Sequence, residues 1–320
     1  REAGAVVVGT TNMTEFAMGG LGLNPHYGNV KNSFDRATGR VPGGSSSGAA
    51  ISVTDGMAAM GLGTDTAGSV RLPAAFNGLA GFKPTVGRIP TDGVFPLSTT
   101  LDTACAMTRS VRDAVTAHEV LAGRRVTPAD KALSARRLAV VQNLFLDGVE
   151  PAVARAFDAA LATLRAAGAQ IEEITLSPLA DLPAMNATGG FSAPEAYAWH
   201  RLLLERSGAG YDPRVAQRIL KGATMKAYEY LDLIRARHAW IARMEAALQG
   251  FDAVLSPTVP ITAPAIASVA PGTERDAEFF RVNGLLLRNP SVVNMLDGCA
   301  VSIPCQAPGD APVGLMLWHA

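Results

Sequence analysis

Three consecutive serines, Ser45–Ser47, follow a glycine pair in the segment "VPGGSSSGAAISV", residues 41–53. Serine hydroxyls that are held in fixed positions can act as nucleophiles or relay a proton. A flexible glycine–serine linker normally lies among polar residues and joins two domains, but this segment runs directly into a helix-compatible apolar stretch. A phosphate-binding loop is also disfavoured, because the segment lacks the GxxxxGK[ST] pattern. We therefore interpret the segment as a rigid loop that presents a nucleophile or relay serine.

A second serine lies in a turn rich in small residues, "GLGTDTAGSVRLPAAFNG", residues 61–78. Ser69 stands at the start of an expected helix, where an N-cap serine is the structural alternative. If Gly68 adopts a backbone angle that other residues disfavour, successive N–H groups can converge on one point beside the serine hydroxyl. Such converging donors form an oxyanion hole. The candidate donors are the backbone amides of Thr66, Ala67, Gly68 and Ser69.

The composition limits the function classes. The chain has 320 residues, and its 28 basic and 28 acidic residues give no net charge, so no basic field indicates nucleic acid or an anionic membrane as a partner. No apolar run approaches the ~20 residues of a membrane span. Cys105, Cys299 and Cys305 form no CxxC pair, which is more typical of a reducing compartment than of a disulfide framework. We expect a cytoplasmic protein.

Short strand-like runs alternate with helical segments along the chain. The apolar spacing over residues 150–167 and 224–248 predicts two helices, each followed by a glycine. No repeat or long linker divides the chain. We therefore expect one α/β domain over residues 1–320, with a large mixed sheet sandwiched between helices. The strand-like runs are Val6–Gly9, Met57–Leu62, Leu79–Phe82, Leu138–Val141, Ile171–Leu176, Ala253–Leu255, Ala300–Ile303 and Val313–Leu317.

Both ends of the sequence interrupt an expected element. The segment "REAGAVVVG" begins like the last turn of a helix, and "PVGLMLWHA" ends on an apolar strand-like run. We expect a domain that is truncated at both ends.

The two serine motifs together resemble the amidase signature family. "GGSSSG", "GTDTAGS" and "RLPAAFNGLAGFKPT" carry the resemblance, and flanking segments extend it over most of the chain. That family uses a Ser–cis-Ser–Lys triad, so the resemblance implies Ser69 as the nucleophile and Ser45 as the bridging serine in a cis peptide after Gly44. It implies no cofactor and an acyl-serine intermediate in the hydrolysis of a carbon–nitrogen amide bond.

The resemblance also assigns supporting roles. Asp65 and Arg71 match the pair that braces the nucleophile turn, and the amides of residues 66–69 match the oxyanion hole. Gly43 and Gly44 would frame the serine loop, with Ser46 as hydrogen-bonding support. Substrate-pocket candidates are Ala17 and Met18.

The catalytic lysine is the main departure from the family pattern. The family places it several tens of residues before the serine loop, where this chain offers only Lys31. Lys31 lies in an expected solvated loop, and Lys83 matches a structural position of the family. We therefore expect the lysine on a missing N-terminal part, and we expect the chain as given to be a poor catalyst or none.

Histidine chemistry is the competing interpretation, because Ser–His–Asp triads recur on unrelated folds. His26 is the histidine nearest the motifs, whereas His238 fits the apolar stripe of its helix and His200 fits a helix surface. No histidine or cysteine cluster has metal-ligand spacing, so we assign no metal.

Three functions stay open. The first is a free-standing amidase that hydrolyses a small-molecule amide. The second is the glutaminase subunit of a tRNA-dependent amidotransferase, against which Asn77 stands, since cysteine is usual there in those subunits. The third is a non-catalytic family member. A homodimer is compatible with the sequence, which carries no signal for the oligomeric state.

Overall fold

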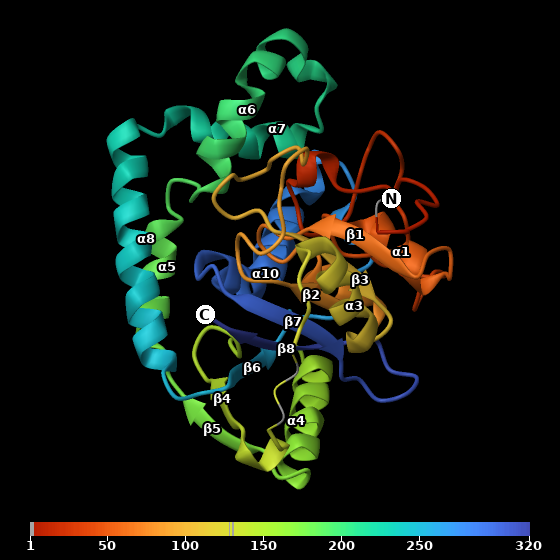
Figure 1. Cartoon of the computed structure of the whole chain (residues 1–320). Helices are drawn as coiled ribbons and strands as arrows, with labels where there is room; N and C mark the ends of the chain where they lie inside the picture. Colours follow the sequence, from red (N-terminus) through yellow and green to blue (C-terminus); the bar gives the residue numbers. More distant parts are fainter. Residues whose placement is uncertain (1–2, 128, 130) are drawn as a thin grey trace.

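The computed structural model describes residues 3–127, 129 and 131–320, and its centre is an eight-stranded mixed sheet (Figure 1). The strand order is β1-β3-β2-β7-β8-β6-β4-β5. Strand β4 pairs in parallel with β5 and β6, and the other pairs are antiparallel. The strands are β1 Met60–Thr64, β2 Ala80–Lys83, β3 Ala104–Thr108, β4 Arg137–Val141, β5 Gln170–Ile174, β6 Ala253–Pro257, β7 Cys299–Pro304 and β8 Gly314–His319.

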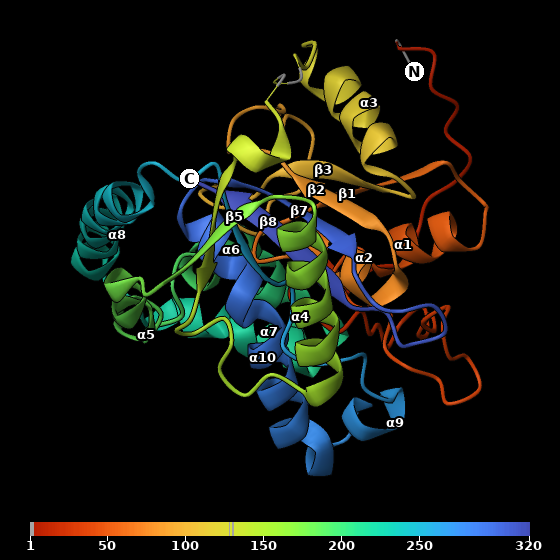
Figure 2. The same cartoon turned by 90° about the horizontal axis from the view of Figure 1, so that it is seen from below.

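Helices cover both faces of this sheet (Figure 2). The α-helices are α1 Ser47–Thr54, α2 Arg71–Asn77, α3 Val111–Ala122, α4 Pro151–Ala166, α5 Leu182–Met185, α6 Ser192–Ser207, α7 Pro213–Leu220, α8 Ala227–Leu248, α9 Ile266–Val269 and α10 Asp276–Met295. Strand residues alternate between the two faces. Leu138 and Val140 of β4 pack in a cluster with Phe157 of α4, whereas Ala139 and Val141 pack in a cluster with Trp240 of α8. The predicted α/β class with a sheet between helices is confirmed.

The serine loop and the nucleophile turn are each followed by a helix on the same face. Helix α1 begins at Ser47, and α2 begins at Arg71. Both helices pack with Met107 of β3 in one core cluster, through small residues such as Ala50 and Ala74. Because small side chains let backbones approach closely, the two motifs lie next to each other in space although they are separate in the sequence.

The structure differs from the strand predictions in two places. Residues 6–9 form no strand, and Val6 is 83% exposed, because this segment hydrogen-bonds to no strand in the described part of the chain. Strand β3 was not predicted, since "ACAMT" has only a short apolar run. It is central to the site region nonetheless, because it pairs with both β1 and β2.

The buried face of α8 also differs from the prediction. His238 is exposed and Leu231 is 54% exposed, whereas Leu233, Arg237 and Trp240 are buried. The side chain of Arg237 donates to the carbonyl of Met295 and to Asp297. The buried face of α8 contains a charged residue, Arg237, so the apolar spacing alone did not identify this face. The prediction of a buried His238 is wrong.

His200 is likewise buried, against its predicted surface position. Its Nδ1 atom lies 2.8 Å from the Tyr211 hydroxyl. Its ring also packs edge-on against Phe16.

Among the described helices, none is long and apolar enough to cross a membrane.

Candidate active site

The serine loop is held by close backbone contacts. Gly43 has a φ of +77°, and a Cβ there would lie 2.7 Å from Leu72 Cδ2. Gly44 donates its N–H to the Gly20 carbonyl at 2.8 Å, and a Cβ on Gly44 would meet the Gly22 nitrogen at 2.5 Å. No side chain fits at either glycine, so the loop requires both.

Ser45 follows a cis peptide bond with Gly44. Its carbonyl accepts hydrogen bonds from the Thr14 amide at 3.0 Å and the Ser47 amide at 2.9 Å. The Oγ atom is buried and has no hydrogen-bond partner among the described residues. A buried hydroxyl without a protein partner is uncommon, and the Ser45 hydroxyl is not committed to another group of the described chain.

The structure brings the two serine motifs into contact. The Ser46 amide donates to the Ser69 carbonyl at 3.3 Å, and Ser69 is 4% exposed. The Ser46 hydroxyl lies 3.5 Å from the Thr64 carbonyl, at the limit of a hydrogen bond. The segments that carry Ser45 and Ser69 therefore lie side by side, and Ser46 joins them through its backbone.

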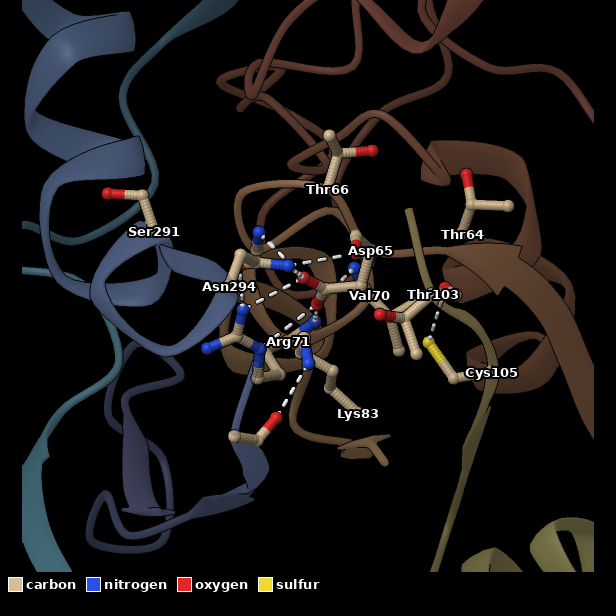
Figure 3. A network of polar contacts seen from close by, with 12 residues as sticks. Thr64, Asp65, Thr66, Val70, Arg71, Lys83, Thr103, Cys105, Ser291 and Asn294 are labelled. Atoms are coloured by element: carbon tan, nitrogen blue, oxygen red, sulfur yellow. Dashed lines mark hydrogen bonds and ion pairs between the residues drawn. The ribbon is translucent and has the colours of Figure 1, made fainter. Parts of the chain in front are cut away.

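Asp65 and Arg71 brace the turn from within (Figure 3). The two side chains form a salt bridge at 2.8 Å, and both are fully buried. Asn294 of α10 completes the network, because its amide nitrogen donates to the Asp65 carboxylate while its oxygen accepts from Arg71. Burial alone would raise the pKa of Asp65, but the charge of Arg71 and its hydrogen bonds outweigh this effect and lower the pKa. Asp65 is thus an ionised structural carboxylate.

One predicted oxyanion donor is already engaged. The Gly68 amide donates to the Asp65 carboxylate at 2.8 Å, so it is not free for a substrate oxygen. Gly68 has a φ of +115°, as the predicted turn requires, and a Cβ there would lie 2.4 Å from Pro290. In the described part of the chain, the amides of Thr66, Ala67 and Ser69 donate to no protein acceptor. These three amides remain the candidate donors.

The family model described as "Amidase" matches residues 1–318 of this chain. The chain belongs to the amidase family. It is 37% identical to the 2-amino-5-chloromuconic acid deaminase of Comamonas testosteroni over 319 residues, which is 98% of this chain and 68% of that protein. It is 34% identical to the A subunit of the glutamyl-tRNA(Gln) amidotransferase of Symbiobacterium thermophilum, over 99% of this chain and 70% of that relative.

A solved amidase structure agrees with this assignment. It superposes with a TM-score of 0.88 at 34% identity, and the match covers 100% of this chain and 71% of the amidase. The fold of this amidase-family chain is therefore that of the solved amidase.

The lysines near the site have other partners. The Lys31 amine contacts the Arg36 carbonyl at 3.4 Å in an exposed loop. Lys83 is fully buried and donates to the carbonyls of Pro84 and Gly298. Burial, together with the nearby charge of Arg71, lowers its pKa to about 8. In Figure 3, Lys83 and Thr66 lie on opposite sides of Asp65. Neither lysine contacts Ser45 or Ser69.

His26 is paired with a carboxylate rather than with a serine. Its Nε2 atom lies 3.0 Å from Glu15 Oε1. No histidine hydrogen-bonds to Ser45 or Ser69 in the described part of the chain. Among the residues that the structure describes, no serine–histidine triad is therefore formed. Across the described residues, no three His, Cys, Asp or Glu side chains are grouped to hold a metal ion.

A cavity of about 1420 Å³ lies next to the serine loop. Ser46, Thr64 and Ala17 line it, together with the rings of Phe16 and Phe95. Met18 instead packs into a core cluster with Leu97 and Val215, so it does not line this cavity. The nucleophile candidate Ser69 is not on the cavity wall either, so the cavity is a neighbour of the site and does not define the substrate position.

Several site residues were missed by sequence reasoning. Asn294 lies more than 200 positions from Asp65, and nothing in its helix marks it as a ligand of a carboxylate. Asp102 accepts a hydrogen bond from the Thr66 hydroxyl at 2.6 Å. Glu195 of α6 binds the loop that carries Asp102. The one local signal was Asp102 itself, an acidic residue just after a serine–threonine run in "PLSTTLDT".

Proposed function

We propose that this protein hydrolyses a carbon–nitrogen amide bond of a small molecule through an acyl-serine intermediate. The Ser69 hydroxyl attacks the amide carbonyl and gives its proton to the Ser45 hydroxyl, which passes a proton to a base. The carbon–nitrogen bond then breaks, and the leaving nitrogen receives a proton through Ser45. Water attacks the ester and releases the acid. Amides of Thr66, Ala67 and Ser69 stabilise the oxyanion.

The contact between the two serine motifs carries this proposal. Ser45 has a buried hydroxyl without a partner among the described residues, and its neighbour Ser46 is hydrogen-bonded to the Ser69 backbone. A relay serine needs a hydroxyl that lies next to the nucleophile and does not donate a hydrogen bond to any other acceptor. The relatives named above support the reaction class, and a reducing, cytoplasmic setting is part of the proposal.

We expect the base to be a lysine, and no lysine of the described residues hydrogen-bonds to the Ser45 hydroxyl. Lys31 and Lys83 are engaged elsewhere. We therefore expect the 320-residue chain alone to react slowly. Added primary amines such as ethylamine should then accelerate reaction at Ser69, with a rate that increases with pH as more amine is neutral. No acceleration at any pH would contradict the need for an external base.

A fluorophosphonate probe tests the nucleophile and the relay. The probe should label Ser69, as located by mass spectrometry of the adducted peptide, and Ser69→Ala should abolish the label. Ser45→Ala should slow labelling while leaving the folded protein intact. Ser52→Ala is a suitable control, because its hydroxyl donates only within α1, to the Ala49 carbonyl. Labelling that is independent of Ser45 would exclude a serine relay.

The similarity to the A subunit of an amidotransferase supports a second candidate, a glutaminase that works with partner proteins. Hydrolysis of simple amides by the isolated protein would favour the amidase. Co-purification of partner proteins, with glutamine as the preferred amide, would favour the glutaminase.

A further inference from the structure

The hydroxyl of Thr66 is held by a residue that the mechanism above does not use. Thr66 is 1% exposed, and its Oγ1 donates to Asp102 Oδ1 at 2.6 Å. The other carboxylate oxygen of Asp102 accepts the amides of Leu97 at 2.9 Å and Ser98 at 3.1 Å. Thr66 is thus fastened by its side chain, which leaves its backbone N–H free to point elsewhere.

We call residues 97–103 the strap, because this loop joins the nucleophile turn to distant helices. At its far end, the Thr103 carbonyl accepts the Asp65 amide at 2.8 Å. Its Leu97 side chain packs in a core cluster with Val215 of α7, and its Leu101 side chain packs in another with Trp240 of α8. The strap therefore contacts the turn on both sides of the bond between Asp65 and Thr66.

Glu195 of α6 anchors the strap. Its Oε2 accepts the Ser98 hydroxyl at 2.5 Å and the Thr100 amide at 3.1 Å. Its Oε1 accepts the Thr100 hydroxyl, and it also accepts the Tyr230 hydroxyl of α8 at 2.6 Å. Glu195 is 7% exposed. Every donor to this buried carboxylate is a neutral hydroxyl or amide, so the arrangement depends on correct placement of each partner.

No lysine or arginine of the described chain lies within salt-bridge distance of Asp102 or Glu195. A buried Glu195 and a half-buried Asp102 without a cation are a poor source of stability, since burial penalises the charged forms. Asp102 instead binds the Thr66 hydroxyl directly, and Glu195 binds the strap that carries Asp102. Thr66 is also the first candidate oxyanion donor after Asp65.

We propose that Asp102 is a positioning residue, which orients the Thr66 amide toward the substrate oxygen, and that Glu195 holds Asp102 in place through the strap. This inference rests on the proposed function, because it assigns Thr66 a role in stabilising the oxyanion. A displaced donor weakens transition-state stabilisation and leaves substrate binding largely unchanged.

The test uses Thr66→Val, which removes the hydroxyl and keeps the backbone amide. We expect Thr66→Val to lower kcat for a small amide, and the rate of fluorophosphonate labelling of Ser69, by about 10-fold to 100-fold, with KM changed little. Thr66→Ser keeps the hydroxyl and should restore most of the rate. Asp102→Ala should resemble Thr66→Val. In Asp102→Asn the side-chain amide can donate to the Thr66 oxygen in place of the lost acceptor, so the loss of rate should be smaller.

Thr258→Val is the matched control. Thr258 is also a buried threonine, directly after β6, and its hydroxyl lies 2.7 Å from the hydroxyl of Ser302 in β7. Both threonine variants should lose similar thermal stability, but only Thr66→Val should lose kcat. Equal labelling rates in wild type and Thr66→Val would overturn the positioning role, and so would a loss confined to KM. All these rates are measured with added ethylamine, and if wild-type Ser69 does not react under that condition, the proposed function and this inference both fail.

Discussion

Two carboxylates, the buried Asp65 and the half-buried Asp102, hold the turn that carries Ser69 through different interactions. Asp65 faces Arg71, and both side chains are fully buried, so the charge is neutralised within the pair. Asp102 faces hydroxyl and amide donors alone. The pKa of Asp65 is therefore lowered, whereas burial raises the pKa of Asp102 above its usual value. The pair of Asp65 and Arg71 mainly stabilises the fold, whereas Asp102 mainly positions Thr66.

Because the two regions use different interactions, we expect mutations near Asp65 to lower the stability of the fold and mutations near Asp102 to lower the reaction rate. Loss of one member of an ion pair leaves an uncompensated buried charge, which costs the whole fold. Loss of one neutral hydrogen bond costs much less stability. It can still cost activity when the lost bond orients a donor. Stability measurements should therefore be most sensitive to the Asp65 region, and rate measurements should expose the strap.

The largest effect should come from Asp65→Asn. It leaves the buried Arg71 without a countercharge, and we expect a loss of about 3–5 kcal/mol in the free energy of unfolding. Urea unfolding followed by circular dichroism would measure it. Asp55→Asn is the control, because Asp55 pairs with Arg36 near the surface, where such pairs contribute ~0–1 kcal/mol. Equal losses in the two variants would remove the contrast between the regions.

Lys83 offers a pH-dependent test of the same buried region. Because burial lowers its pKa in the folded state to about 8, the unfolded chain binds more protons between that pH and the usual value of 10.5. The wild type should therefore gain stability relative to Lys83→Met as pH rises through this window, by at most about 3 kcal/mol. A constant difference between the two proteins from pH 7 to 10 would contradict the lowered pKa.

Tyr230→Phe should have a smaller effect on the strap region. It removes one of the hydroxyl donors to Glu195, and we expect a loss of roughly 1 kcal/mol in the free energy of unfolding. A double-mutant cycle with Glu195→Gln should show coupling of the two side chains, since both act through one hydrogen bond. Additive losses would mean that Glu195 does not depend on Tyr230.

The smallest effect is a difference in how the free energy of unfolding depends on pH in the Asp65→Asn and Asp102→Asn variants. The lowered pKa of Asp65 provides stability that is lost below the usual pKa of about 4, so the stability advantage of wild type over Asp65→Asn should shrink there. The raised pKa of Asp102 acts with the opposite sign. The stability of wild type relative to Asp102→Asn should increase as pH falls from 7 toward 4. Parallel unfolding curves for both variants would contradict this.

The sequence by itself determined the local parts of this protein. The serine loop and the turn before Ser69 were predicted from glycine spacing within residues 41–71, and the pair of Asp65 and Arg71 was expected from the family resemblance. The helices at 151–166 and 227–248 also followed from periodicity, because apolar spacing reports an element whatever it packs against. The proximity of the two serine motifs was expected from the family resemblance, and the structure shows the backbone bond from Ser46 to Ser69 that joins them.

Only the tertiary structure decided the rest. The Gly68 amide is taken by Asp65, and Asn294 completes that network from α10. Asp102 and Glu195 meet through a strap whose partners come from four separate segments. No local pattern records such pairings, because they arise from which faces of distant elements are buried against each other. The exposed segment at residues 6–9 teaches the same lesson, since an apolar run becomes a strand only when another strand is there to pair with it.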